Sequence, residues 1–141
     1  MRVTNLILHI ITVIIMLPDL VFVGLNTLVG LGYLDGVELI IVPTAAMIFF
    51  AAFLASTAGA IITMVAYKKS PRVYITRELL IHIVSAVCFV MAIIYLILIR
   101  LHSSVHGSGF SEVINIAGLI VSVAGITVTL IGRRKIKKAA K

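Results

Sequence analysis

Two short segments of this sequence carry a histidine in nearly the same apolar setting. Residues 6–12 (LILHIIT) and residues 79–85 (LLIHIVS) each place one histidine three positions before a hydroxyl side chain. Each segment opens a long apolar stretch, where an ionisable side chain is costly and usually has a function. His9 and His82 are therefore the first candidates for chemistry. Two imidazoles at matched positions predict a metal-centred cofactor held between two helices.

The composition is that of an integral membrane protein. Of the 141 residues, 62% are apolar and only 12% are charged, whereas soluble domains average about 45–50% apolar and about 25% charged residues. The one cysteine, Cys88, excludes a disulfide framework and a thiolate metal site. The sequence has no Gly-rich phosphate loop, nucleophile constellation or carboxylate pair, so we do not expect a stand-alone hydrolase or transferase.

Four apolar segments are each long enough to cross a bilayer, which takes about 20 residues. The connections between them are short, which predicts an all-α, up-down-up-down four-helix bundle that forms one transmembrane domain over 1–141. The expected helices cover about 5–31, 37–67, 77–101 and 110–132, with a basic tail at 133–141.

Side chains suited to helix N-termini support these starting points. A cap oxygen or carboxylate is expected at Thr4 or Asn5, at Thr76 with Glu78, and at Ser111 with Glu112. The first segment is too long for a signal peptide and no small-residue cleavage site follows it, so we expect it to be retained.

The net charge of +7 follows membrane topology rather than nucleic-acid binding. Every basic residue except Arg100 adjoins the same side of the alternating segments. By the positive-inside rule, both termini and the basic loop at 68–76 are predicted to be cytoplasmic, in a multi-pass protein of the cell membrane. Contact of the basic tail with anionic lipid headgroups is a second interpretation of the same charges.

The two histidines are expected at one depth, about one turn inside the cytoplasmic ends of the first and third helices. These helices are diagonal partners in an up-down bundle, so both imidazoles can face its core. We predict that His9 and His82 are the axial ligands of one haem b. Thr12 and Ser85 lie one turn further on and are expected to hydrogen-bond to the ligand histidines.

The second and fourth segments offer small side chains beside the predicted cofactor: Ala51, Ala55, Ala58, Gly59, Gly118, Ser122 and Gly125. The haem propionates are expected to face the cytoplasm near Arg77 and Lys68, with Lys69 and Arg2 close by. The alternative is that these small residues only let the helices pack closely, with nothing between them.

A weak repeat extends beyond the histidines. It pairs Glu38 with Glu112 and Gly59 with Gly132. Both halves run in the same direction, so a true 2+2 duplication predicts a two-fold axis along the membrane normal. Chance similarity between aliphatic segments is the alternative.

Three further ionisable side chains are Asp19, His102 and His106. Asp19 lies ten residues beyond His9, about 15 Å deeper along a helix, and Pro18 before it frees a backbone carbonyl. A carboxylate at mid-membrane predicts proton or cation transport, or else a protonated, hydrogen-bonded side chain. His102 and His106 lie in a Ser/Gly-rich connection and are interpreted as solvated loop histidines.

The segment from His82 to Arg100 resembles the third span of small prokaryotic four-helix membrane proteins of the bis-histidine b-type cytochrome kind. Such proteins include an unassigned family found beside Rieske and cytochrome modules. The resemblance implies that His82 is a haem ligand and that His9 is the equivalent residue on the first helix.

These observations lead to three hypotheses. The first is a haem-b-binding subunit with an electron-transfer or accessory role in a quinone-linked respiratory complex, which implies partner subunits and is compatible with a neighbouring quinone pocket, although no specific motif supports one. The second is a non-catalytic structural or assembly subunit that packs through its small-residue stripes and binds lipid. The third is a small proton- or cation-coupled transporter that uses Asp19.

Overall fold

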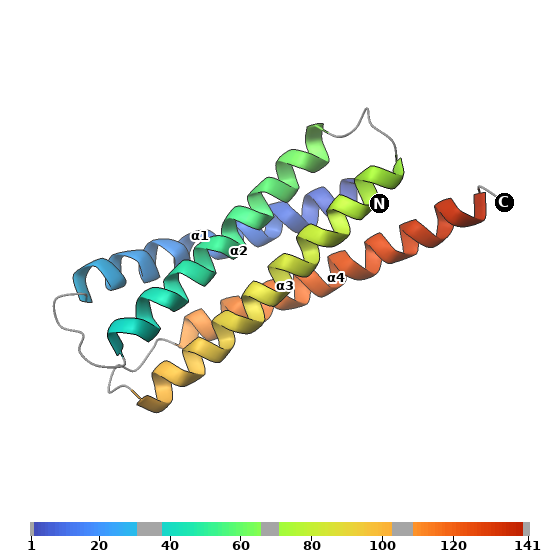
Figure 1. Cartoon of the computed structure of the whole chain (residues 1–141). Helices are drawn as coiled ribbons and strands as arrows, with labels where there is room; N and C mark the ends of the chain where they lie inside the picture. The colour runs from blue at the N-terminus through green and yellow to red at the C-terminus, as the bar shows by residue number, and fades with distance from the viewer. Residues whose placement is uncertain (1, 31–37, 66–70, 103–108, 140–141) are drawn as a thin grey trace.

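The computed structural model describes residues 2–30, 38–65, 71–102 and 109–139, and every described segment is an α-helix. Within these segments, the side chains at 18–19, 22–30, 38–43, 45–46, 71–72, 99, 102, 109–111 and 139 lie outside the description. The helices are α1 (Arg2–Gly30), α2 (Glu38–Val65), α3 (Pro71–His102) and α4 (Gly109–Ala139), as Figure 1 shows.

The helices are long enough for a membrane. They contain 29, 28, 32 and 31 residues, or about 42–48 Å each at a rise of 1.5 Å per residue. Among the described residues, three stretches are both long and apolar enough to span a bilayer: Met47–Val65, Val73–Leu98 and Glu112–Lys138. The prediction of an all-α protein with four helices is confirmed, and these three stretches agree with a membrane protein. The described part of α1 contributes a shorter apolar stretch, Arg2–Leu17.

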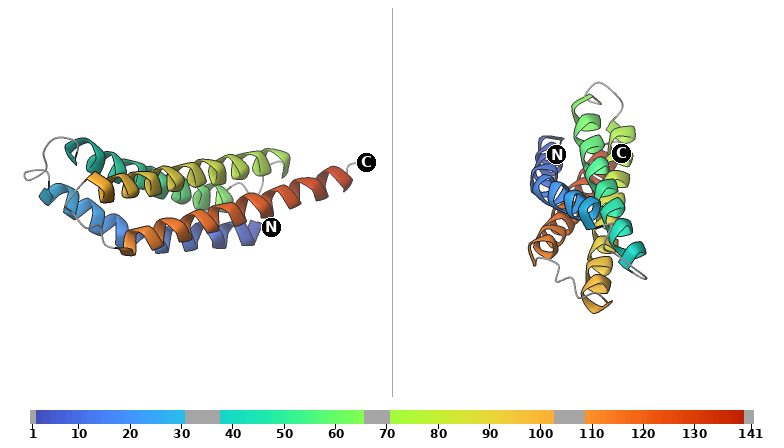
Figure 2. Two further views of the ribbon diagram at one scale, coloured as in Figure 1. Left: turned by 90° about the horizontal axis from the view of Figure 1, so that it is seen from below. Right: turned by 90° about the vertical axis from the view of Figure 1, so that its left-hand side faces the viewer.

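Each helix packs against two others. α2 and α4 both contact α1 and α3, so α1 and α3 lie diagonally across the bundle. Figures 1 and 2 show the start of α1, the end of α2, the start of α3 and the end of α4 at the same end of the bundle. The last turns of α4 extend beyond the other three helices at that end.

Buried positions recur at alternating spacings of three and four residues, which is the pattern of helices packed at a shallow crossing angle. One half of the core is polar, and it includes the two histidines. The other half is apolar and consists of Met16, Phe49, Ala52, Phe89 and Ile114. The buried positions that line the bundle are Asn5, His9, Thr12 and Met16 on α1; Phe49, Ala52, Ser56, Gly59 and Thr63 on α2; Glu78, His82, Ser85 and Phe89 on α3; and Asn115, Gly118, Ser122, Gly125 and Thr129 on α4.

The outer surface of the bundle is apolar, in contrast to the polar part of its core. Large aliphatic side chains such as Ile14, Leu80 and Ile120 are 63%, 63% and 64% exposed. Contiguous apolar surface of this kind is rare on soluble monomers. A polar interior inside an apolar shell is consistent with lipid as the surrounding solvent.

Two predicted helix boundaries were wrong, and packing explains the first. α3 begins at Pro71 rather than at 77, with a proline at its first position. Tyr74 and Ile75 are buried against Ile62 and Ile136, so burial of this turn extends the helix into the predicted basic loop. Thr76 and Glu78 therefore lie inside α3 and do not cap it.

The predicted basic tail is mostly helix, because α4 continues to Ala139. Lysine and arginine are good helix formers, and their charges are favourable at a helix C-terminus. At the opposite end of the bundle, Arg100 on α3 pairs with Glu112 on α4 at 3.2 Å. This pairing accounts for the one basic residue that departs from the charge pattern.

Candidate metal centre

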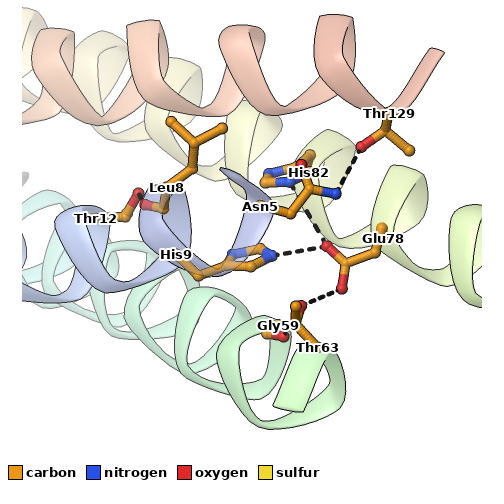
Figure 3. Close-up of polar contacts among 9 residues, drawn as sticks. All are labelled: Asn5, Leu8, His9, Thr12, Gly59, Thr63, Glu78, His82 and Thr129. Atoms are coloured by element: carbon orange, nitrogen blue, oxygen red, sulfur yellow. Dashed lines mark hydrogen bonds and ion pairs between the residues drawn. The ribbon is translucent and has the colours of Figure 1, made fainter. Parts of the chain in front are cut away.

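The structure brings together the two histidines that the sequence singled out. His9 from α1 and His82 from α3 meet in the polar half of the core (Figure 3). Their rings are stacked, with centroids 4.4 Å apart and planes inclined by 4°. The two residues are only 2% and 1% exposed.

Glycines from the neighbouring helices make room for both rings. A Cβ atom added to Gly59 on α2 would lie 2.4 Å from Cε1 of His9, and one added to Gly125 on α4 would lie 2.3 Å from Cε1 of His82. Only a residue without a side chain permits such close approach. These two predicted small residues therefore accommodate imidazoles directly.

Glu78 completes the group. Its Oε2 atom lies 3.0 Å from Nε2 of His9 and 3.8 Å from Nε2 of His82. Its other carboxylate oxygen accepts a hydrogen bond from the Thr63 hydroxyl, and the residue is fully buried. Figure 3 shows the carboxylate at the edge of the stacked rings.

The sequence interpretation missed Glu78 because it treated this residue as a helix cap. Two signals were present. Glu78 precedes His82 by four residues, so the two side chains share one face of a helix. It also occupies the position in the second half that Asn5 occupies in the first.

Two buried polar atoms beside the group have no hydrogen-bond partner among the described residues: Nε2 of His82 and Oγ of Ser85. Such atoms are uncommon in folded proteins and call for an explanation, such as an ion. The Thr12 hydroxyl, predicted to support His9, instead donates to the backbone carbonyl of Leu8 at 2.9 Å.

Charge limits how this group can be occupied. At the ring separation of 4.4 Å, two imidazolium ions would repel each other by about 4 kcal/mol at an effective dielectric constant of about 20. One carboxylate can balance one of these charges. The site therefore suits a single added cation, either a proton or a metal ion.

The donor set is typical of a transition-metal site. The ligand atoms of His9, Glu78 and His82 all lie within 4.8 Å of one another, and all three residues are buried. Imidazole with carboxylate suits divalent zinc, iron, copper or nickel. The thiol of Cys88 is not one of the three.

The arrangement does not fit bis-histidine ligation of haem. Axial imidazoles approach the iron from opposite faces of the porphyrin, each with a nitrogen aimed at the metal. Here the two rings stack directly on each other, and both Nε2 atoms lie on the side of Glu78. Haem stays a prediction of the sequence.

Other predicted cofactor neighbours lie elsewhere. Arg77 is exposed on α3, and Ala51 and Ala58 are exposed on α2, turned away from the core. Gly118 contacts Phe89 rather than a histidine. The side chains of Lys68, Lys69, Asp19, His102 and His106 lie outside the described residues.

Two polar contacts between the halves are equivalent. The Asn5 amide donates to Oγ1 of Thr129 at 3.1 Å, linking α1 with α4. The Thr63 hydroxyl donates to Glu78, linking α2 with α3. Asn5 and Glu78 each precede a stacked histidine by four residues, so the two contacts are related by a pseudo-two-fold axis between the rings.

This relation corrects the predicted register of the repeat. Gly59 contacts the first histidine and Gly125 contacts the second. The spatial partner of Gly59 is therefore Gly125 rather than Gly132. α4 is shifted by two helical turns from the alignment expected from the sequence.

Compared with known proteins, the chain matches no protein-family model, no curated protein and no solved structure. The site is therefore interpreted from its own geometry and chemistry.

Proposed function

We propose that this chain is a multi-pass protein of the cell membrane that binds one divalent transition-metal ion through His9, Glu78 and His82. The observation that carries the proposal is the buried group itself, whose ligand atoms lie within 4.8 Å of one another. Three protein ligands leave a coordination position for water or another group. The unpartnered Nε2 atom of His82 is a free donor for the ion.

Each ligand has a distinct part in this proposal. Two neutral imidazoles supply lone pairs, and the Glu78 carboxylate offsets one charge of the ion inside a low-dielectric bundle. A coordinated metal lies in the plane of an imidazole ring. One of the two parallel rings must therefore turn for both lone pairs to meet at one ion.

The proposed orientation is up-down-up-down, with both termini and the connection between α2 and α3 in the cytoplasm. The concentration of basic residues at the end of the bundle near the site supports it. The metal then lies a few turns inside the cytoplasmic surface. Membrane lipid surrounds the bundle, and other membrane-complex subunits are the proposed protein partners.

A proton site is the second candidate, and one observation favours it. Nε2 of His9 lies 3.0 Å from Oε2 of Glu78 while the two imidazole rings are parallel. These two atoms can hold a proton between them without rotation of either ring. In that case the bundle would serve proton- or cation-coupled transport, with Asp19 as the deeper carboxylate.

The test is metal binding by the purified full-length chain. Metal content is measured by elemental mass spectrometry, and Zn²⁺ and Co²⁺ affinities by competition with a chelating dye. We expect one ion per chain, and an affinity lower by at least about a hundredfold in His9→Ala, His82→Ala and Glu78→Gln, since each loses a ligand. Glu112→Gln, which removes a carboxylate at the other end of the bundle, is the matched control and should bind normally.

The same preparation decides between the candidates. Failure to bind either ion, or equal affinity in all four variants, would overturn the metal proposal. A reduced-minus-oxidised visible band that disappears in His9→Ala and His82→Ala would instead support the predicted haem b and its respiratory role. Proton uptake in liposomes that depends on Glu78 and Asp19, without metal binding, would support the proton site.

A further inference from the structure

We infer that a second site binds the phosphate of an anionic phospholipid headgroup between the start of α3 and the C-terminal part of α4. A cavity of about 350 Å³ lies there, lined by Ile75, Thr76, Arg133, Ile136 and Lys137. None of these residues belongs to the His–Glu–His group, so the inference is independent of the proposed metal function.

The lining places two cations on one face of α4. Arg133 and Lys137 are four residues apart, which aligns their side chains along the helix. Both are exposed, and neither forms an ion pair within the described segments. A guanidinium binds two phosphate oxygens at once, and an ammonium adds a point charge beside it.

Apart from the exposed Thr76, the rest of the lining is aliphatic. Ile75 is buried and packs with Ile136 against the end of α2. A cavity with cations on one side and aliphatic carbons on the other fits the boundary between a phosphate and the glycerol and acyl carbons of a lipid. A free inorganic phosphate would leave the aliphatic wall without a partner.

The cavity also lies at the expected level of a membrane surface. Leu130 and Ile131 are 41% and 50% exposed apolar side chains on α4. Five basic residues follow within the next two turns, as at the boundary between hydrocarbon and headgroups. The only acidic residue in 71–80 and 120–139 is Glu78, which is buried and bonded to His9 and Thr63. No local carboxylate therefore competes for the two cations.

The experiment measures lipid retained by the purified full-length chain. Protein is reconstituted in nanodiscs of phosphatidylcholine alone or of equal parts phosphatidylcholine and phosphatidylglycerol, and bound lipid is counted by native mass spectrometry. The double variant Arg133→Ala/Lys137→Ala should retain at least about tenfold less phosphatidylglycerol, since it removes both charge-assisted contacts with the phosphate. Ile136→Trp, which fills the cavity without changing charge, should show a similar loss.

The matched control is Arg134→Ala/Lys138→Ala, which removes the same charge from the same helix outside the cavity. We expect less than about a threefold change in this control, since exposed charges outside the cavity make only weak, screened contacts. An equal loss in both double variants, or unchanged retention in Ile136→Trp, would overturn the site in favour of diffuse surface charge. Displacement of the lipid by inorganic phosphate in the wild type would assign the site to free phosphate instead. Far-ultraviolet circular dichroism of every variant reports folding, so this test stays separate from that of the metal site.

Discussion

The N-terminal half, α1 with α2, and the C-terminal half, α3 with α4, bury equivalent side chains in the same order. They differ in charge at one buried position, where the first half has Asn5 and the second has Glu78. The pairs that correspond are His9 with His82, Thr12 with Ser85, Met16 with Phe89, Ser56 with Ser122, Gly59 with Gly125, and Thr63 with Thr129.

This single difference sets the charge of the core. Two asparagines would leave the stacked imidazoles without a counter-ion. Two carboxylates would place like charges together inside the bundle, where their repulsion is weakly screened. One asparagine and one glutamate give a nearly symmetric site that is suited to one added cation.

The largest expected effect comes from moving the carboxylate between the halves. Glu78→Asn should weaken Zn²⁺ binding by at least about a hundredfold, because it removes a charged ligand. The exchange Asn5→Glu/Glu78→Asn should restore affinity to within about tenfold of wild type. Position 5 precedes His9 just as position 78 precedes His82, and its side chain already reaches the polar core.

The dye competition assay measures both variants, and Asn5→Glu alone is the control for the added carboxylate. An exchange variant as weak as Glu78→Asn would show that the two halves are not equivalent around the rings. A difference between the surroundings of Thr63 and those of Thr129, its counterpart beside position 5, would then explain why the carboxylate works from α3 alone.

The second prediction concerns the glycines that contact the rings. Gly59→Ala and Gly125→Ala should each lower the free energy of unfolding by about 1–3 kcal/mol, since a new Cβ forces a ring to move. The two losses should be similar, because the added Cβ atoms would lie 2.4 and 2.3 Å from the two rings.

Unfolding in mixed detergent micelles, followed by circular dichroism, measures these energies. Gly132→Ala is the matched control. It should be neutral or stabilising, since alanine is the better helix former. A loss in Gly132→Ala as large as in Gly125→Ala would contradict the register of α4 that the contacts define.

The helices were predictable from the sequence, whereas two of their boundaries were not. Long apolar runs identified four helices because an apolar segment of about 20 residues or more is typical of a helix that crosses a bilayer. The start of α3 was misjudged because basic residues there resemble a loop. Only tertiary packing of Tyr74 and Ile75 shows why the helix continues through that region.

The site was predictable in part. The histidine pair stood out because an ionisable side chain inside an apolar run is unusual, and it occurred twice. Glu78 was missed because a carboxylate near the expected start of a helix is also a good cap. The register of the glycines was missed because Gly59 follows His9 by 50 residues whereas Gly125 follows His82 by 43, so one offset cannot align both helix pairs.

The smallest expected difference concerns the two threonines that hold the polar side chains in place. Thr63→Val removes a hydrogen bond to a carboxylate and should cost about 2 kcal/mol of unfolding free energy, whereas Thr129→Val removes an acceptor from a neutral amide and should cost about 1 kcal/mol. Valine keeps the shape of threonine, so packing changes little. Thr127→Val, an exposed threonine bonded only to its own helix backbone, is the control and should be nearly neutral. Equal costs at 63 and 129 would mean that the carboxylate of Glu78 is held no more strongly than the amide of Asn5. The charge difference between these two residues would then not distinguish the stability of the two halves.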